Sequence, residues 1–216
     1  LDRELPRGLY KANTEELEEW LGRDEWSTKT KETYWTHTVG FFRWAVGKYL
    51  DFDPTLDMLR PRPRRRLPRP VTAAQLRLAL DQLDPLCARA VLLAAAVGMR
   101  ASEIADAVRA DFTEERVLIV GKGEKSRSVP TDPLVWAEVR DEPDGPLIRW
   151  HGHRVDGDWL SRHASARLSR IGLPAVTLHR FRHWFGTTLQ REYRDLQLTA
   201  DLMRSEEHTS ELQSRH

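Results

Sequence analysis

The stretch from Leu59 to Pro70 constrains the fold of this chain more than any other feature of its sequence. It reads LRPRPRRRLPRP and contains four prolines, which lack a backbone N–H and fix φ, so no regular helix can run through it. The sequence therefore predicts a linker over 59–70. This linker would join one folded domain at 1–58 to a second at 71–203, with residues 204–216 as a tail.

The linker is also strongly basic, although the whole chain of 216 residues has a formal net charge of only +1. It contains no acidic residue and six arginines: Arg60, Arg62, Arg64, Arg65, Arg66 and Arg69. Dense arginines attract a phosphate backbone because their binding releases counterions. A solvated spacer is the alternative, and we favour a linker that touches DNA.

The composition argues against a secreted or membrane protein. The single cysteine, Cys87, cannot form an internal disulfide, and its apolar neighbours indicate a buried thiol. The longest apolar run, Ala90–Met99, is too short to span a bilayer. Because no signal peptide is visible, we expect a cytoplasmic protein without membrane contact.

Two amphipathic helices are predicted before the linker. Asn13 and Glu16 form a capping-box pattern for the first helix, and the second should begin near Ser27 or Thr28. Apolar positions of the second helix recur at helical spacing: Tyr34, Thr38, Phe41, Ala45 and Tyr49. Such an aromatic stripe is more typical of a core than of a base-stacking surface. The region therefore reads as a small helical domain.

The segment after the linker reads as helical with one β-hairpin. Thr72 and Gln75 form a second capping box, and Pro85 opens a helix that is apolar on most faces and stops at Gly98. Ser102 is expected to cap the next helix. The remaining predicted elements are a hairpin of 116–120 and 127–130, loops over 141–158, and helices over 160–171 and 179–191. The expected fold class is mostly α with a small antiparallel β-hairpin (α+β).

Three short groups of residues could carry chemistry. Arg100, in GMRASEI, follows the buried helix and would be held rigidly near the core. Lys122, in VGKGEKSRSVP, lies at the hairpin tip, where a mobile lysine can reach a ligand. His179, Arg182 and His183 share one helical face, where their charges repel unless an anion is present. Taken singly, each group could instead be a surface arginine, a solvated turn, or a core histidine beside exposed arginines.

Nucleotide and metal sites have less support in the sequence. The glycines around the hairpin do not form the GxxxxGK[ST] pattern of a phosphate-binding loop. The histidines of the third group lack an accompanying cysteine or an HExxH pattern for zinc. We therefore expect neither a metal nor another cofactor.

In their order and context, the three groups resemble the tyrosine recombinase family, also called the phage integrases. The resemblance spans about Asn13 to Met203. GMRASEI is similar to the family's first arginine box, VGKGEKSRSVP to its β-hairpin, and LHRFRHWFGTTL to its second box. The resemblance implies a helical, SAM-like core-binding domain followed by an integrase-type catalytic domain. It also implies double-stranded DNA as the partner, a linker that lies along it, and oligomerisation on it.

The resemblance also implies residue roles. The matching positions are catalytic (Arg100, Lys122, His179 and Arg182) or supportive (Glu103 and His183). The two arginines would bind the scissile phosphate, since guanidinium forks match its oxygens, keep their charge and need no metal. The lysine would protonate the leaving 5′ oxygen, and His179 would accept or position the proton of the nucleophile. Glu103 would orient the guanidinium of Arg100.

The sequence departs from the family pattern towards its C-terminal end. The family's nucleophile is a tyrosine that forms a 3′-phosphotyrosyl intermediate, but no tyrosine follows Tyr193. Tyr193 itself comes only 11 residues after Arg182, which is too early for the nucleophile. Residues 204–214 resemble a translated sequencing adapter, so 204–216 are expected to be a non-native tail. We therefore expect a chain that is truncated, lacks its nucleophile and is inactive as written.

Three functions remain open from the sequence. The favoured one is a site-specific recombinase or integrase that works by metal-independent phosphoryl transfer. The second is a catalytically inactive DNA-binding relative that acts as a regulator. The third is a relative of type IB topoisomerases, which share the chemistry; the arginine linker and the separate helical domain favour recombination over DNA relaxation.

Overall fold

The computed structural model describes residues 4–63, 69–121, 126–194 and 202. The chain separates into two compact units, a first unit of Leu1–Leu67 and a second unit of Pro68–His216. The division falls inside the basic proline-rich stretch. Each unit has its own cluster of buried apolar side chains, as expected for parts that fold around separate cores.

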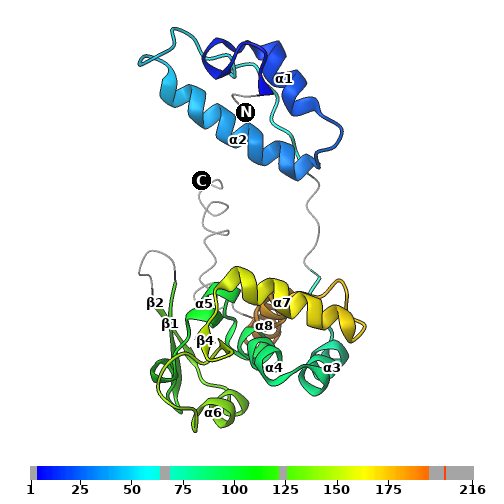
Figure 1. The fold of residues 1–216 in the computed structure, drawn as a ribbon, viewed down its shortest axis with the longest axis vertical. Helices are drawn as coiled ribbons and strands as arrows, with labels where there is room; N and C mark the ends of the chain where they lie inside the picture. The colour runs from blue at the N-terminus through cyan, green and yellow to red at the C-terminus, as the bar shows by residue number, and fades with distance from the viewer. Residues whose placement is uncertain (1–3, 64–68, 122–125, 195–201, 203–216) are drawn as a thin grey trace. The chain divides into compact units, whose positions relative to one another are not determined.

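The first unit is helical (Figure 1). Its elements are the 3₁₀ turn η2 (Leu9–Lys11) and the helices α1 (Thr14–Gly22) and α2 (Thr28–Ala45). The predicted caps are confirmed. Asn13 and Glu16 form a reciprocal capping box at α1, and the Ser27 hydroxyl accepts the N–H of Thr30 at α2.

The predicted apolar stripe of α2 is wrong at its two outer tyrosines. Tyr34 is 38% exposed, and Tyr49 is 61% exposed and lies beyond the helix. The helix stops at Ala45 because Val46 is extended and Gly47 has φ +76°. The buried residues of α2 are Thr38, Val39, Phe42 and Ala45. The core face of α2 therefore keeps Thr38 and Ala45 of the predicted stripe and includes Val39 and Phe42 in place of the tyrosines.

The second unit is mostly helical with two small antiparallel sheets (Figure 1). In its first half the elements are α3 (Ala73–Gln82), α4 (Pro85–Leu92), the π-turn η3 (Leu93–Val97), α5 (Ala101–Asp106), the 3₁₀ turn η4 (Arg109–Asp111) and β1 (Arg116–Val120). In its second half they are β2 (Ser126–Pro130), α6 (Pro133–Val139), β3 (Arg149–Trp150), β4 (His153–Arg154), α7 (Gly157–Arg170) and α8 (Leu178–Tyr193). The α+β prediction and the principal hairpin are confirmed: β1 pairs with β2 in antiparallel register from Arg116↔Pro130 to Val120↔Ser126.

Two local predictions for the second unit are wrong, and one helix was not predicted. Ser102 does not cap α5, because the N-cap is Arg100 and the helix begins at Ala101, two residues earlier than a cap at Ser102 implies. The region expected to be loops contains the short pair β3–β4, and α7 already begins at Gly157 after the capping carboxylate of Asp156. Helix α6 was not predicted, although Asp132 and Pro133 form an N-terminal signal of the expected kind.

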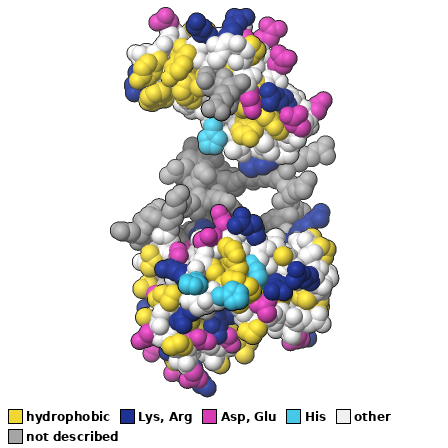
Figure 2. Space-filling view, viewed as in Figure 1, with side chains coloured by type: hydrophobic (Ala, Val, Ile, Leu, Met, Phe, Trp, Pro, Cys, Tyr) yellow, Lys and Arg dark blue, Asp and Glu magenta, His cyan; other side chains and the backbone are white. Residues whose placement is uncertain are grey.

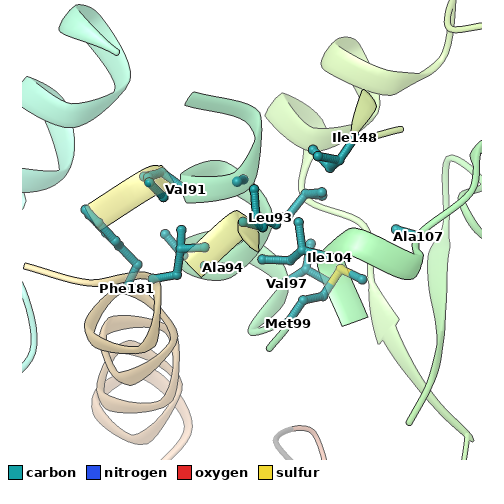
Figure 3. Packing of buried hydrophobic residues seen from close by; sticks show 14 of the residues in the cluster. Val91, Leu93, Ala94, Val97, Met99, Ile104, Ala107, Ile148 and Phe181 are labelled. Carbon is teal, nitrogen blue, oxygen red and sulfur yellow. The ribbon is translucent and has the colours of Figure 1, made fainter. Parts of the chain in front are cut away.

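The helix that begins at Pro85 lies at the centre of the second unit. Cys87, Val91, Leu93 and Val97 are fully buried, which confirms the predicted burial on several sides. In Figure 3, the ring of Phe181 from α8 lies against Val91. The core of this unit thus joins the helix that ends at Gly98 to the helix that carries the HxxR sequence.

The outer surface does not carry charge of one sign. Basic, acidic and histidine side chains intermingle on the visible face of the second unit (Figure 2). This mixture agrees with the net charge of +1. An anion-binding site must therefore come from local geometry, not from bulk charge.

Candidate functional site

Gly98 ends the central helix and lets two distant segments meet. It is left-handed, with φ +71°, and a Cβ atom at this position would lie 2.3 Å from Cδ1 of Phe185. Only glycine avoids both the backbone strain and this clash. Helix α8 therefore packs directly against the turn that leads to Arg100.

The buried carboxylate of Glu103 organises that turn. Its Oε2 accepts the backbone N–H of Arg100 at 2.8 Å, and its Oε1 accepts Nη1 of the same arginine at 3.0 Å. From strand β2, Arg127 donates Nη1 to Oε1 at 2.8 Å and Nη2 to Oε2 at 2.7 Å. Each carboxylate oxygen thus accepts two hydrogen bonds, and the side chain is only 3% exposed.

Arg182 reaches the same point from α8. Its Nη1 donates to the carbonyl oxygen of Gly98 and lies 3.8 Å from Oε2 of Glu103. Nη2 of Arg127 donates to the same carbonyl at 3.3 Å. The structure therefore brings Arg100, Glu103 and Arg182 together, as the sequence motifs indicate, and adds Arg127 to them.

The electrostatics of this arginine cluster (Arg100, Glu103, Arg127 and Arg182) favour an anion. Burial raises the pKa of Glu103, but the hydrogen bonds from Arg127 and Arg100 and the charges of Arg127 and Arg182 outweigh it and lower that pKa to about 2. The carboxylate is thus ionised at neutral pH, and within the described part of the chain three guanidinium groups lie around it. Arg100 is 44% exposed, so an anion can approach the cluster there.

The two histidines of the third motif lie beside one another on α8. The ring centroids of His179 and His183 are 4.4 Å apart, at an interplanar angle of 78°. His179 is exposed, whereas Arg182 turns inward and is 4% exposed. His179 and Arg182 therefore differ in exposure, and Arg182 lies 3.8 Å from the carboxylate of Glu103.

Arg180, between His179 and Arg182, has a separate role that the sequence did not indicate. Its guanidinium donates to the carbonyl oxygens of Arg69 at 2.6 Å, Ala175 at 2.8 Å and Pro70 at 3.5 Å. These bonds fasten the end of the linker to the start of α8.

Some of the predicted site residues lie outside the described residues, namely Lys122 and the linker arginines Arg64, Arg65 and Arg66. The remaining linker arginines differ from one another. Arg62 and Arg69 are exposed, whereas Arg60 pairs with Glu32 at 3.0 Å and lies over the ring of Trp35 at 5.7 Å. Part of the charge of Arg60 is therefore already neutralised within the first unit.

Arg127 is the site residue that sequence reasoning missed. The signal was the alternation of the hairpin: in β2, Arg127 and Val129 are buried and their neighbours are exposed. An arginine on the inward face of a two-stranded hairpin needs a buried acid, because an isolated buried charge is costly. Glu103 was the available partner.

A further cluster of side chains in the second unit could in principle bind a metal ion. Ligand atoms of Asp84, Cys87 and His163 lie within 4.8 Å of one another. However, Nε of Arg167 lies 3.5 Å from the Asp84 carboxylate and donates to His163 at 3.4 Å, so a cation already occupies that side of the cluster. Burial and the nearby Asp84 also raise the pKa of the Cys87 thiol to about 12, which fits the predicted buried structural thiol.

None of the helices in the described ranges combines the length and the apolar character needed to cross a membrane.

Comparison with known proteins points in one direction. No family model matches the chain. A tyrosine recombinase XerA from Thermococcus kodakarensis is 30% identical over 193 residues, which cover 80% of this chain and 68% of the relative. A tyrosine recombinase XerC from Rhodospirillum centenum is 32% identical over 188 residues, covering 76% of this chain. The chain spans only 54% of the length of that second relative.

Solved structures share the fold. The integrase from mycobacterium phage Brujita has 25% sequence identity and a TM-score of 0.60, over 93% of this chain and 72% of that one. A lambda integrase (75–356) dimer bound to a COC′ core site has 14% sequence identity and a TM-score of 0.80, over 96% of this chain and 84% of that one. The second likeness concerns the fold alone.

Proposed function

Because this chain belongs to the tyrosine recombinase family, we propose that it acts in site-specific DNA recombination, by breaking and rejoining phosphodiester bonds. One observation carries the proposal: Arg100 and Arg182, which come from distant parts of the sequence, meet around the buried carboxylate of Glu103. Double-stranded DNA is the proposed substrate, with several copies of the protein assembled on it in the cytoplasm.

The proposed chemistry relies on preorganised positive charge. Attack on a phosphodiester concentrates negative charge on the non-bridging oxygens, and guanidinium groups stabilise that charge in the transition state without a metal. Arg100 is the accessible donor, and Arg182, held beside the same carboxylate, is proposed to join it at the phosphate. His179, exposed beside His183, is proposed to accept or position the proton of a nucleophile.

Lys122 is proposed as the general acid that protonates the leaving 5′ oxygen. In a chain that carries the family's tyrosine, Lys122→Ala should slow strand cleavage far more than DNA binding. A substrate with sulfur in place of the leaving oxygen should largely restore cleavage, because a thiolate leaves without a proton. If sulfur restores nothing, Lys122 is not the proton donor, and Lys125 becomes the candidate.

The linker arginines are proposed to contact the DNA backbone. Replacing Arg64, Arg65 and Arg66 with Ala should flatten the slope of log affinity against log salt by up to about one unit per lost phosphate contact. Arg60→Ala is the matched control, because this arginine is already paired with Glu32, and it should change the slope less. An unchanged slope in the triple variant would show that the segment is a spacer.

The 216-residue polypeptide itself is proposed to be inactive in cleavage, since no tyrosine follows Tyr193. The same observation favours one alternative, a DNA-binding relative of the same fold that acts as a regulator. The two differ once a family tyrosine is supplied: a recombinase then cleaves DNA, and a regulator still only binds it.

A further inference from the structure

Arg127 is a buried charge that the hairpin itself does not need. It is 8% exposed, its cross-strand partner is Ile119, and the neighbouring inward residues Val117 and Val129 are apolar. An aliphatic side chain would continue this apolar face at no electrostatic cost. A buried guanidinium, in contrast, must recover a desolvation penalty of several kcal/mol. Its position therefore calls for a reason beyond hairpin packing.

We propose that Arg127 is a positioning residue that acts through Glu103 to hold the guanidinium groups of Arg100 and Arg182 in their phosphate-binding geometry. This inference rests on the proposed function. Arg127 does not contact the phosphate itself, because Nη1 and Nη2 already donate to Glu103 and Gly98 and the side chain is buried.

The geometry explains how the effect is transmitted. A carboxylate held by one donor can turn about its terminal bond, whereas two parallel hydrogen bonds from one guanidinium fix its plane. With the plane of Glu103 fixed, Oε1 faces Nη1 of Arg100, and Oε2 faces both the backbone N–H of Arg100 and Nη1 of Arg182. The fork of Arg127 therefore sets both arginines through one carboxylate.

A second shared acceptor reinforces the arrangement. Arg127 and Arg182 both donate to the carbonyl oxygen of Gly98, the left-handed residue that ends the central helix. Arg127 also lies in β2, the strand that follows the segment containing Lys122. One side chain thus ties strand β2 to both arginine motifs.

The experiment uses arginine side-chain NMR on the 216-residue chain. The signals of the terminal guanidinium nitrogens show whether rotation of the group is hindered by fixed hydrogen bonds. Loss of a contact that only stabilises the fold elsewhere would leave this rotation unchanged. The variants are Arg127→Met, which removes the fork, and Arg127→Lys, which keeps the charge but lacks the planar fork that bonds both carboxylate oxygens in parallel. Arg89→Met is the matched control: Arg89 also donates to a carboxylate and a carbonyl, those of Glu138 and Leu147, but away from the cluster.

The expected result is loss of hindered rotation at Arg100 and Arg182 in both Arg127 variants, while the Arg89 signals stay as in the parent chain. Arg89→Met should leave Arg100 and Arg182 unchanged. In a Glu103→Gln background, Arg127→Met should cause little further loss of hindered rotation at Arg100 and Arg182, because both changes interrupt the same chain of contacts. The inference would be overturned if Arg100 and Arg182 kept their hindered rotation in Arg127→Lys. It would also be overturned if the losses of hindered rotation in Glu103→Gln and Arg127→Met added up in the double variant.

Inorganic phosphate links the inference to the proposed function. In the parent chain, added phosphate should shift the Arg100 signal, and in Arg127→Lys the midpoint concentration should rise about tenfold, which corresponds to about 1.4 kcal/mol. If phosphate shifts nothing in the parent chain, the proposed anion site fails. The role of Arg127 is still decided by the rotation of the two guanidinium groups.

Discussion

Glu103→Gln should remove a large, pH-dependent part of the stability of the second unit. In the folded chain the pKa of Glu103 is about 2, against 4.5 for an unperturbed glutamate, because hydrogen bonds and charges from the arginines outweigh burial. A depressed folded pKa contributes stability that is present above the unfolded pKa and is lost as pH falls towards the folded value. A shift from 4.5 to 2 corresponds to about 3 kcal/mol.

Most of this contribution of Glu103 to the unfolding free energy can be measured between neutral pH and about pH 3. Between neutral pH and about pH 3, the unfolded carboxyl becomes protonated while the folded one stays largely ionised, so roughly 2 kcal/mol should be lost. The assay is urea denaturation across this range, followed through NMR signals of the second unit. The difference in unfolding free energy between parent and Glu103→Gln should shrink by about 2 kcal/mol as the pH is lowered. Curves that stay parallel from neutral to acid pH would refute the account of this carboxylate.

Two further predictions concern the segments around the arginine cluster. Gly98→Ala should destabilise the second unit by about 2–5 kcal/mol, because alanine would be left-handed there and its Cβ would clash with Phe185. Gly172→Ala is the control, since Gly172 has φ +84° and a Cβ there would have no atom within 4 Å. It should show only the backbone cost of about 1–2 kcal/mol. Equal losses in thermal or urea unfolding would show that α8 does not pack against Gly98. Arg180→Gln should speed amide hydrogen exchange at Val71 about tenfold, because the carbonyls of Arg69 and Pro70 lose a charged donor, and unchanged exchange would mean that Arg180 does not fasten the linker.

Much of the fold followed from local signals in the sequence. The capping boxes at Asn13 and Thr72, the left-handed stop at Gly98 and the β1–β2 hairpin are set by residues near in sequence, and the structure has them as predicted. The failures come from competition between local signals. Ser102 is a good capping residue, but the side chain of Glu103 accepts the N–H of Arg100, so the helix begins two residues earlier than a cap at Ser102 implies.

The site could be predicted only in part, because its contacts are long-range. The motifs identify Arg100 and Arg182, but no local pattern states that Arg182 turns inward to the carbonyl of Gly98. Arg127 was identifiable only from strand alternation combined with the need for a buried partner. Arg180 bonds backbone carbonyl groups that are far away in the sequence. Every residue has a backbone carbonyl, so the residue types at those positions could not identify the partners of Arg180.

Covalent trapping of DNA tests the central claim most directly. Two chains are compared on a randomised pool of nicked suicide duplexes: the 216-residue polypeptide, and a chimaera in which the residues after Leu202 are replaced by the C-terminal segment of the Thermococcus kodakarensis relative. The account predicts a protein–DNA adduct, stable in denaturing gels, for the chimaera alone, and its loss in Arg182→Ala with DNA binding retained. A chimaera that binds DNA but never forms an adduct would contradict recombination and favour a regulator. An adduct of the 216-residue chain that disappears with Tyr193→Phe would make Tyr193 the nucleophile and contradict the proposed inactivity.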